Sequence, residues 1–284
     1  MNQNFRKISI LGGGLLGGSL ALALQGKTDA SLWLRKPTAI GAAREFGISQ
    51  VTSELSHAVK EVDLLILAVP VGAMPMLLQA AIHAGLPSDC LVTDVGSVKK
   101  VPHDTLSPIV AKSGNPFIGS HPMAGSEQNG LSAARGNLFA NATCLLTNDS
   151  GASDKLCERI ELFWQSLGCR NHWFTAAEHD SLVARISHLP HLTAAATAAV
   201  SLKQISDGLF GGGGLRDTTR VAAGNPSMWA EIITENRAAL VPALRETIDQ
   251  LLEILASLEK ADQERAQQWL AHAKALRDTL PPTA

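Results

Sequence analysis

The chain has 284 residues, a formal net charge of −2 and no tyrosine, although it has seven phenylalanines and five tryptophans. The missing tyrosine excludes reactions that use a tyrosine as acid, base or nucleophile, including those of reductases that pair a tyrosine with a lysine on a dinucleotide-binding sheet. The near-neutral charge gives no electrostatic reason to expect binding to nucleic acid or to an anionic membrane.

The N-terminus and the cysteines are typical of a cytoplasmic protein. Residues 1–14 lack the organisation of a signal peptide, because their short apolar stretch runs directly into glycines. No apolar run approaches the roughly 20 residues needed to cross a bilayer. The cysteines at 90, 144, 157 and 169 form no CxxC pair and have no histidine cluster at zinc-ligand spacing. We therefore expect free thiols, no metal site and a cytoplasmic location.

The first 175 residues alternate short apolar runs with helical patterns. Lys7–Leu11 predicts a buried strand, and glycines and a helix that ends before Gly26 follow it. Further strands are predicted at Ser31–Leu34, Val62–Val69, Leu91–Thr93, Phe117–Gly119 and Thr143–Leu146. Strands that alternate with helices indicate βαβ units and a parallel sheet. We therefore expect an α/β dinucleotide-binding domain of the Rossmann type over residues 1–175.

The chain from Ala176 onward reads as helix, with one glycine-rich break at Gly211–Gly214. We expect an all-α C-terminal domain over residues 176–284. Six apolar residues in its long amphipathic stretch repeat at intervals of three and four: Val241, Leu244, Ile248, Leu251, Leu255 and Leu258. Such a seam packs either inside its own domain or against a second subunit. The partner we expect is a second copy of the chain, in a homodimer formed through the C-terminal helices.

Residues 12–17 fit the G-x-G-x-x-G pattern between a predicted strand and a predicted helix. The first glycine of this pattern permits a tight turn, the second lets the backbone approach a pyrophosphate, and the third lets the helix pack closely on the sheet. The N–H groups at the start of the helix then bind phosphates. The cofactor contacts expected here, and at the end of the strand before Pro70, are Gly12, Gly14, Leu15, Leu16, Gly17, Val69 and Pro70.

The residues after the second predicted strand indicate which dinucleotide binds. NAD sites usually have an acidic residue there, which binds the ribose 2′-hydroxyl. In this chain Arg35, Lys36, Pro37 and Thr38 follow the strand instead. Two cations and a hydroxyl suit a 2′-phosphate, so we predict NADP as the preferred cofactor and NAD as a possible second one.

Two residues in polar, glycine-containing segments are suited to oxidation of a hydroxy acid. His121, at the end of a predicted strand, is placed to accept a proton from an alcohol as hydride leaves its carbon. Arg220 is suited to bind a carboxylate through two parallel hydrogen bonds.

Taken singly, the residues in these segments also have ordinary structural roles. His121 or His188 can be a buried, hydrogen-bonded histidine, and Ser97 can cap a helix. Arg216 or Arg220 can form a surface ion pair with Asp217. Their joint occurrence therefore matters more than any one of them.

Six segments, in their order and spacing, resemble the prephenate/arogenate dehydrogenase family of tyrosine biosynthesis: GGGLLGGSLA, VDLLILAVP, DVGSVK, GSHPMAGSE, SHLPH and GLRDTTR. The resemblance extends from about residue 6 to 260. It implies an NADP- or NAD-dependent oxidative decarboxylation of prephenate, arogenate or both, to 4-hydroxyphenylpyruvate or tyrosine. It also implies a Rossmann domain followed by a helical dimerisation domain.

The resemblance further implies roles for individual residues. His121 would accept the proton of the substrate's 4-hydroxyl group, and Ser97 would orient that hydroxyl and His121. Arg220 would bind a substrate carboxylate. The residues implied to lie near the substrate, or to shape its pocket, are His191, Glu127, Asp217 and Trp229.

Three other kinds of protein share parts of this pattern. A dehydrogenase specific for arogenate or for 4-amino-4-deoxyprephenate would share the same motifs. A β-hydroxyacid dehydrogenase or imine reductase would place a catalytic lysine in the helical domain, where Lys203 is the only lysine between residues 176 and 259 and lies in no glycine or asparagine motif. A nucleotide-sensing module would not require Ser97, His121 and Arg220 together.

Overall fold

The computed structural model describes residues 5–125, 128 and 130–281. An eight-stranded sheet has the order β3-β2-β1-β4-β5-β6-β7-β8. Its strands are β1 (Lys7–Leu11), β2 (Asp29–Trp33), β3 (Val51–Thr52), β4 (Leu64–Leu67), β5 (Leu91–Asp94), β6 (Phe117–Pro122), β7 (Thr143–Thr147) and β8 (Arg170–Phe174). All neighbouring pairs are parallel except β6–β7.

Helices cover both faces of the sheet, and each face has its own apolar core. Alternate residues of β4 point to opposite faces, so Leu64 and Ile66 belong to one core and Leu65 and Leu67 to the other. The first core is covered by α1 (Leu15–Leu24), α2 (Ala39–Glu45) and α6 (Asp154–Ser166), and the second by α3 (Leu55–Ala58), α4 (Met74–His83) and α5 (Lys100–Ser113). The expected α/β Rossmann-type fold is confirmed.

The sheet differs from the prediction in three respects. The expected parallel arrangement does not hold for β7, which pairs antiparallel with β6; the part of their connection that the structure describes contains the short turn η2 (Leu131–Ala133) and no crossover helix. Strand β6 is longer than predicted, so His121 lies inside a strand and not on a loop. Strands β3 and β8 were not predicted, because β3 has two residues and β8 has the weakly apolar sequence RNHWF.

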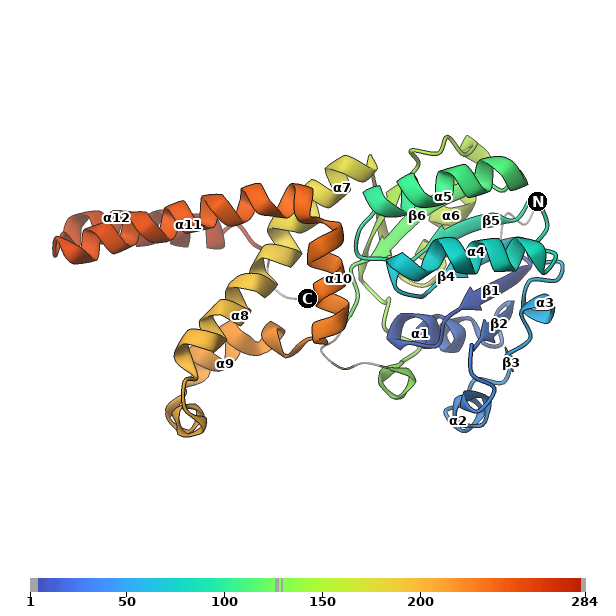
Figure 1. Ribbon diagram of the computed structural model, residues 1–284, viewed down its shortest axis with the longest axis horizontal. Coiled ribbons are helices and arrows are strands. Elements are labelled where there is room, and N and C mark those ends of the chain that lie inside the picture. The colour runs from blue at the N-terminus through green and yellow to red at the C-terminus, as the bar shows by residue number, and fades with distance from the viewer. Residues whose placement is uncertain (1–4, 126–127, 129, 282–284) are drawn as a thin grey trace.

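The remainder of the described chain is helical. It comprises α7 (Ala176–Val183), a π-helical turn η3 (Ala184–His188), α8 (Leu189–Ser201), α9 (Gly213–Thr219), α10 (Pro226–Glu235), α11 (Arg237–Glu259) and α12 (Gln263–Arg277), with short helical turns η4 (Ile205–Phe210) and η5 (Arg220–Ala223). A further short turn, η1 (Val71–Ala73), lies in the sheet region between β4 and α4. Only part of the predicted glycine break is non-helical, because Gly213 and Gly214 form the first turn of α9. Helices α11 and α12 form a hairpin that projects away from the sheet (Figure 1).

The projecting helices leave many apolar side chains exposed. Within the predicted seam of α11, Val241, Ile248, Leu251, Leu255 and Leu258 are each 47–66% exposed. The hairpin partner α12 has no buried residue, so it does not cover this surface. In the described part of the chain, no helix combines the length and apolar character needed to span a membrane, and no cluster of side chains has the composition of a metal site.

Candidate active site

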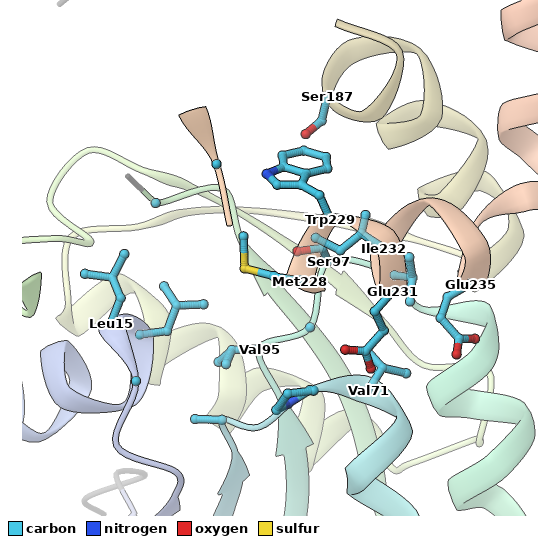
Figure 2. A pocket seen from close by; sticks show the side chains of 18 of the residues that line it. Leu15, Val71, Val95, Ser97, Ser187, Met228, Trp229, Glu231, Ile232 and Glu235 are labelled. Carbon is cyan, nitrogen blue, oxygen red and sulfur yellow. The ribbon is translucent and has the colours of Figure 1, made fainter. Parts of the chain in front are cut away.

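A cavity of about 520 Å³ lies between the sheet and the helical region (Figure 2). The glycine loop and the segments that follow β4 and β5 form its sheet side, and η3, η5 and α10 form its helical side. Predicted site residues that border it are Gly14, Leu15, Leu16, Val69, Pro70, Ser97, Arg220 and Trp229. Segments far apart in the sequence therefore meet at the carboxyl edge of the parallel strands, where open α/β sheets bind ligands.

The glycine loop has the geometry required to hold a dinucleotide. Gly12 has a φ of +120°, and a Cβ atom there would lie 2.3 Å from the Ala68 carbonyl oxygen. A Cβ on Gly17 would lie 1.9 Å from the Gly12 oxygen, so helix α1 packs against the loop only because this position lacks a side chain. Around Gly14 there is open space, and this residue borders the cavity. These residues fit a pyrophosphate at the N-terminus of α1.

The segment after β2 lies beside this loop. The Gly12 amide donates to the Trp33 carbonyl oxygen at 3.1 Å, which joins the loop to the end of β2. Arg35, Lys36 and Thr38 follow directly and are exposed. None of them borders the cavity itself.

Ser97 borders the cavity on the loop between β5 and α5. The N-cap of α5 is Lys99, so the alternative role of Ser97 as a helix cap does not apply. Below it, the Lys99 ammonium lies 2.6 Å from the Asp94 carboxylate, and both side chains are fully buried. The Asp94 carboxylate also accepts the backbone N–H groups of Gly96 and Ser120. This network fixes the shape of the loop that carries Ser97.

His121 is hydrogen-bonded to a second buried histidine. Its Nδ1 lies 2.9 Å from Nε2 of His179, and Nδ1 of His179 lies 2.8 Å from Oδ1 of Asp180. The Asp180 carboxylate also accepts the backbone N–H groups of Lys99 and Lys100, at 2.7 and 2.9 Å. All three side chains of this His121–His179–Asp180 chain are buried. His121 is not itself among the residues that border the cavity, although Ala124 and Gly125 of its motif are.

The buried histidines are weak bases. Burial, followed by the nearby His179, Lys99 and His188, holds the pKa of His121 well below its usual value. Burial also lowers the pKa of His179, and it lowers that of His188 to about 4 although the Asp180 charge acts in the opposite direction. These rings are therefore neutral at neutral pH, as a proton acceptor requires.

His188 and Asn236 extend the hydrogen-bonded network around Asp180. The Asn236 side-chain amide donates to the backbone oxygen of Asp180 at 2.8 Å and contacts Nδ1 of His188 at 3.0 Å. His188 is thus the buried, hydrogen-bonded histidine considered in the sequence analysis, but it also borders the cavity. It ends the π-helical turn η3, a feature frequently found at functional sites.

His191 lies behind the cavity wall. Its ring stacks on Trp229 with 3.6 Å between ring centroids and 9° between planes, and Trp229 forms the wall (Figure 2). His191 is not among the residues that border the cavity, so it contacts the wall and not the open space.

The remaining predicted residues have different locations. Arg220, on η5, borders the cavity, and within the described residues it forms no ion pair with Asp217. Asp217 is exposed on α9 and does not border the cavity. Glu127 lies outside the described residues.

Four functional candidates were missed by the sequence analysis: His179, Asp180, Glu231 and Glu235. His179 lies 58 residues from His121, and no local pattern links the two. Glu231 and Glu235 border the cavity from α10, and Glu231 accepts the Gly72 backbone N–H at 2.8 Å across the two regions (Figure 2). Met228, Ile232 and these two glutamates share one helical face, and this 3–4 spacing was a signal that could have found them.

Comparisons with known families divide the chain into two parts. The nucleotide-binding domain of prephenate dehydrogenase matches residues 20–172, and the dimerization domain of prephenate dehydrogenase matches residues 175–272. The two matches together cover most of the chain, and they meet close to the end of β8.

Individual relatives agree with these matches. The chain is 32% identical to a prephenate dehydrogenase from Bacillus subtilis, over 99% of this chain and 78% of the relative. It is 33% identical to a cyclohexadienyl dehydrogenase from Zymomonas mobilis, over 91% of this chain and 90% of the relative.

Two solved structures share the fold over nearly the whole chain. One is a prephenate dehydrogenase from A. aeolicus in complex with hydroxyphenyl propionate and NAD⁺, with a TM-score of 0.85, 27% identity and coverage of 96% of this chain and 97% of that one. The other is an arogenate dehydrogenase from Synechocystis, with a TM-score of 0.77, 28% identity and coverage of 96% and 99%.

Proposed function

This chain belongs to the prephenate dehydrogenase family, and from that membership we propose that its cavity accepts prephenate and that NADP is its preferred cofactor. The activity of the family is the NAD(P)-dependent oxidative decarboxylation of prephenate or arogenate, and this chain is such an oxidoreductase. The proposal depends on one observation, which is that the glycine loop, Ser97 and Arg220 border the same cavity.

The residues around the glycine loop would hold the dinucleotide. Gly14, Leu15 and Leu16 would hold its phosphates, and Val69 and Pro70 border the same cavity. When bound, the dinucleotide supplies the hydride acceptor for C4 of the substrate ring.

The remaining chemistry requires one base and groups that orient the substrate. Nε2 of His121 takes the proton of the 4-hydroxyl group as the O–H bond breaks, and the hydroxyl of Ser97 orients that group. Loss of this proton, together with loss of the C4 hydrogen as hydride to the bound dinucleotide, oxidises C4 to a carbonyl. The bond from C1 to the ring carboxylate then breaks, CO₂ leaves, and its electron pair completes the aromatic ring. The proton returns from His121 to the ring oxygen, which gives the phenol.

The other polar groups bind and enclose the substrate. Arg220 binds a substrate carboxylate from the helical side of the cavity. Trp229, backed by His191, forms a wall against the ring. For Asp217 and Glu127 we propose that their carboxylates gate or shape the pocket. A water-poor cavity strengthens each of these interactions.

The preference for NADP rests on Arg35, Lys36 and Thr38. They are exposed beside the glycine loop, which is where a 2′-phosphate would lie. Residues 34–38 include no acidic side chain to bind a 2′-hydroxyl. A guanidinium binds phosphate through two parallel hydrogen bonds, so Arg35 contributes most.

The exposed seam of α11 supports a homodimer. A dimerization-domain model matches residues 175–272, and the seam residues lie within this range. A second copy would cover them, which makes residues 1–175 the nucleotide-binding unit and residues 176–284 the substrate and dimerisation unit. An exposed apolar surface of this extent is otherwise unfavourable in water.

We place the enzyme in the cytoplasm. Its four cysteines are unpaired, and three of them are buried. Burial raises the pKa of the Cys169 thiol to about 11, so this group remains an unreactive thiol. Unpaired thiols are typical of reducing compartments.

A two-by-two assay tests the proposed function. Purified protein is mixed with prephenate or arogenate, and with NADP⁺ or NAD⁺, and the absorbance of the reduced cofactor is followed. We expect turnover of prephenate with a higher kcat/KM for NADP⁺ than for NAD⁺. Equal or better use of NAD⁺ would contradict the role of Arg35, and no turnover of either substrate would contradict the proposed function.

A further inference from the structure

The catalytic base of this site is held by residues of another region. His121 lies on β6 in the sheet, whereas His179 and Asp180 lie on α7, the first helix after the sheet. His179 is fully shielded from solvent, and Asp180 is 5% exposed. A capping box between Thr175 and Glu178 fixes the start of α7, immediately before these two residues.

The charge state of Asp180 determines the direction of the hydrogen bonds. Burial alone would raise the pKa of this carboxyl group, but hydrogen bonds from His179 and from the Lys100 and Lys99 backbone amides hold the pKa below its usual value. Asp180 is therefore an ionised carboxylate, which only accepts hydrogen bonds. Its Oδ1 must accept from Nδ1 of His179, at 2.8 Å.

The protonation of His179 then fixes which atom donates in its hydrogen bond with His121. A neutral His179 with its proton on Nδ1 has an unprotonated Nε2, which only accepts. Nδ1 of His121, 2.9 Å away, must therefore carry the proton that is donated to it. A neutral imidazole has one N–H group, so Nε2 of His121 is left with a lone pair.

We propose that His179 and Asp180 are positioning residues that hold His121 in its Nδ1–H tautomer, so that Nε2 is always an unprotonated base. The inference rests on the proposed role of His121 as the proton acceptor. It goes beyond that role by assigning two residues outside the recognised motifs and by making the base depend on contact between the sheet and α7. Asp180 is well suited to this, because it is fixed by two backbone N–H groups at the start of α5.

The His121–His179–Asp180 chain also explains how the proton is accommodated during the reaction. When Nε2 takes the proton of the substrate, His121 becomes an imidazolium and its Nδ1–H group donates more strongly to His179. The negative charge of Asp180 lies at the far end of the same chain, so it stabilises the positive charge that develops. No proton needs to move to His179 or Asp180 for this effect.

Two substitutions at one position separate tautomer control from packing. In His179→Leu no acceptor remains for Nδ1 of His121, so the ring is free to adopt the Nε2–H form that blocks the base. In His179→Gln the side-chain carbonyl oxygen can replace Nε2 as acceptor. We expect kcat to fall about 10- to 100-fold in His179→Leu, the size usual for loss of a residue that orients a functional histidine. We expect His179→Gln to remain within about 10-fold of the native kcat.

His103→Leu is the matched control. His103 is a buried histidine of the sheet region that contacts Thr147 and Ser150 and belongs to neither the cavity nor the His121–His179–Asp180 chain. Its loss reports the general cost of replacing a buried histidine by leucine. We expect a lower melting temperature in His103→Leu with a native kcat. KM for prephenate should change little in any of the three variants, because none of these residues binds substrate in the proposal.

The tautomer itself is observable. In ¹⁵N-histidine-labelled protein at pH 7.5, we expect the His121 signal to show a protonated Nδ1 and an unprotonated Nε2, and this pattern to be lost in His179→Leu. A native protein with the proton on Nε2 of His121, or a His179→Leu enzyme with native kcat, would overturn the proposal. The spectrum of the native protein needs no variant, so it tests the proposal even if His179→Leu does not fold. Failure of the native enzyme to oxidise either substrate would instead contradict the proposed function and leave the tautomer result to be judged by the spectrum alone.

Discussion

The sheet region, residues 5–174, and the helical region, residues 176–281, bury their apolar side chains in different ways. In the sheet region the two cores are closed by the chain's own helices, and among the described residues of this region only Phe46, Met76 and Trp173 are large apolar residues with substantial exposure. In the described helical region fifteen such residues are exposed, and α9, α10 and α12 bury none of their residues. The sheet region therefore completes its core within one chain, whereas the helical region requires a further surface.

The groups of the proposed active site are divided between the same two regions. The glycine loop, Ser97 and His121 belong to the sheet region, and Arg220, Trp229 and His179 belong to the helical region. In the proposal, the groups that react belong to the sheet region, and the groups that orient the base and bind the substrate belong to the helical region. The contact between the two regions is then part of the proposed active site.

The largest effect is expected from charges placed in the seam. Leu251 and Leu255 are 56% and 47% exposed, and in the proposed dimer they are buried. In the double variant Leu251→Glu/Leu255→Glu four carboxylates would have to be buried without partners, so we expect dimerisation to weaken by about 10⁴-fold or more, or about 5–6 kcal/mol.

Sedimentation equilibrium measures this change. Met76→Glu is the matched control, since Met76 is an apolar residue of α4 with 74% exposure that lies far from the seam in sequence. It should leave the oligomeric state unchanged. A dimer that survives the double substitution would show that the seam does not form the interface.

The next effect concerns the buried ion pair of the sheet region. Lys99→Met would leave the Asp94 carboxylate buried without its cation, and we expect a loss of about 3–5 kcal/mol in the free energy of unfolding. Lys100→Met removes the adjacent, exposed pair with Asp104 and should cost less than about 1 kcal/mol. Urea titration of both variants measures the difference. Equal losses would mean that burial of the Lys99–Asp94 pair has no energetic consequence.

A smaller effect is expected at the cofactor. Arg35→Gln should raise KM for NADP⁺ about 10- to 100-fold, because a hydrogen bond to a charged group is lost, and should leave KM for NAD⁺ nearly unchanged. Arg44→Gln, an exposed cation in the last turn of α2, is the control for general loss of positive charge. Steady-state kinetics with both cofactors gives the result. An equal rise in KM for NADP⁺ and NAD⁺ in Arg35→Gln would contradict a contact between Arg35 and the 2′-phosphate.

The smallest effect is the pH dependence of stability at the contact between regions. Burial lowers the pKa values of His121, His179 and His188 in the folded protein, the last to about 4, whereas in the unfolded chain histidine titrates near pH 6.5. Below about pH 6.5 the unfolded state binds more protons, so stability falls as the pH is lowered. We expect a loss of about 1–3 kcal/mol between pH 7.5 and 5.

Urea titrations across this range test the histidine contribution. The slope with pH should be shallower in His188→Asn, which removes one of these groups. A free energy of unfolding that stayed constant from pH 7.5 to 5 in the native protein would contradict the lowered pKa values of these buried histidines.

The sequence was sufficient for local features and insufficient for long-range ones. The strand Lys7–Leu11 and the glycine loop were predictable because an apolar run followed by G-x-G-x-x-G has few other structures. The antiparallel β7 was not, since the direction of a strand depends on a pairing partner more than 20 residues away. The contact of His121 with His179 likewise depends on how α7 packs against the sheet, which neither residue's neighbours encode.

The most direct test of the account is the effect of His121→Asn on turnover. Asparagine can still place a polar atom near His179 but has no group that accepts a proton at neutral pH. We expect kcat with prephenate and the preferred cofactor to fall about 10²- to 10⁴-fold, with cofactor affinity and melting temperature close to native. A His121→Asn enzyme with near-native kcat would contradict the assignment of His121 as the base and, with it, the role of the buried chain that holds it.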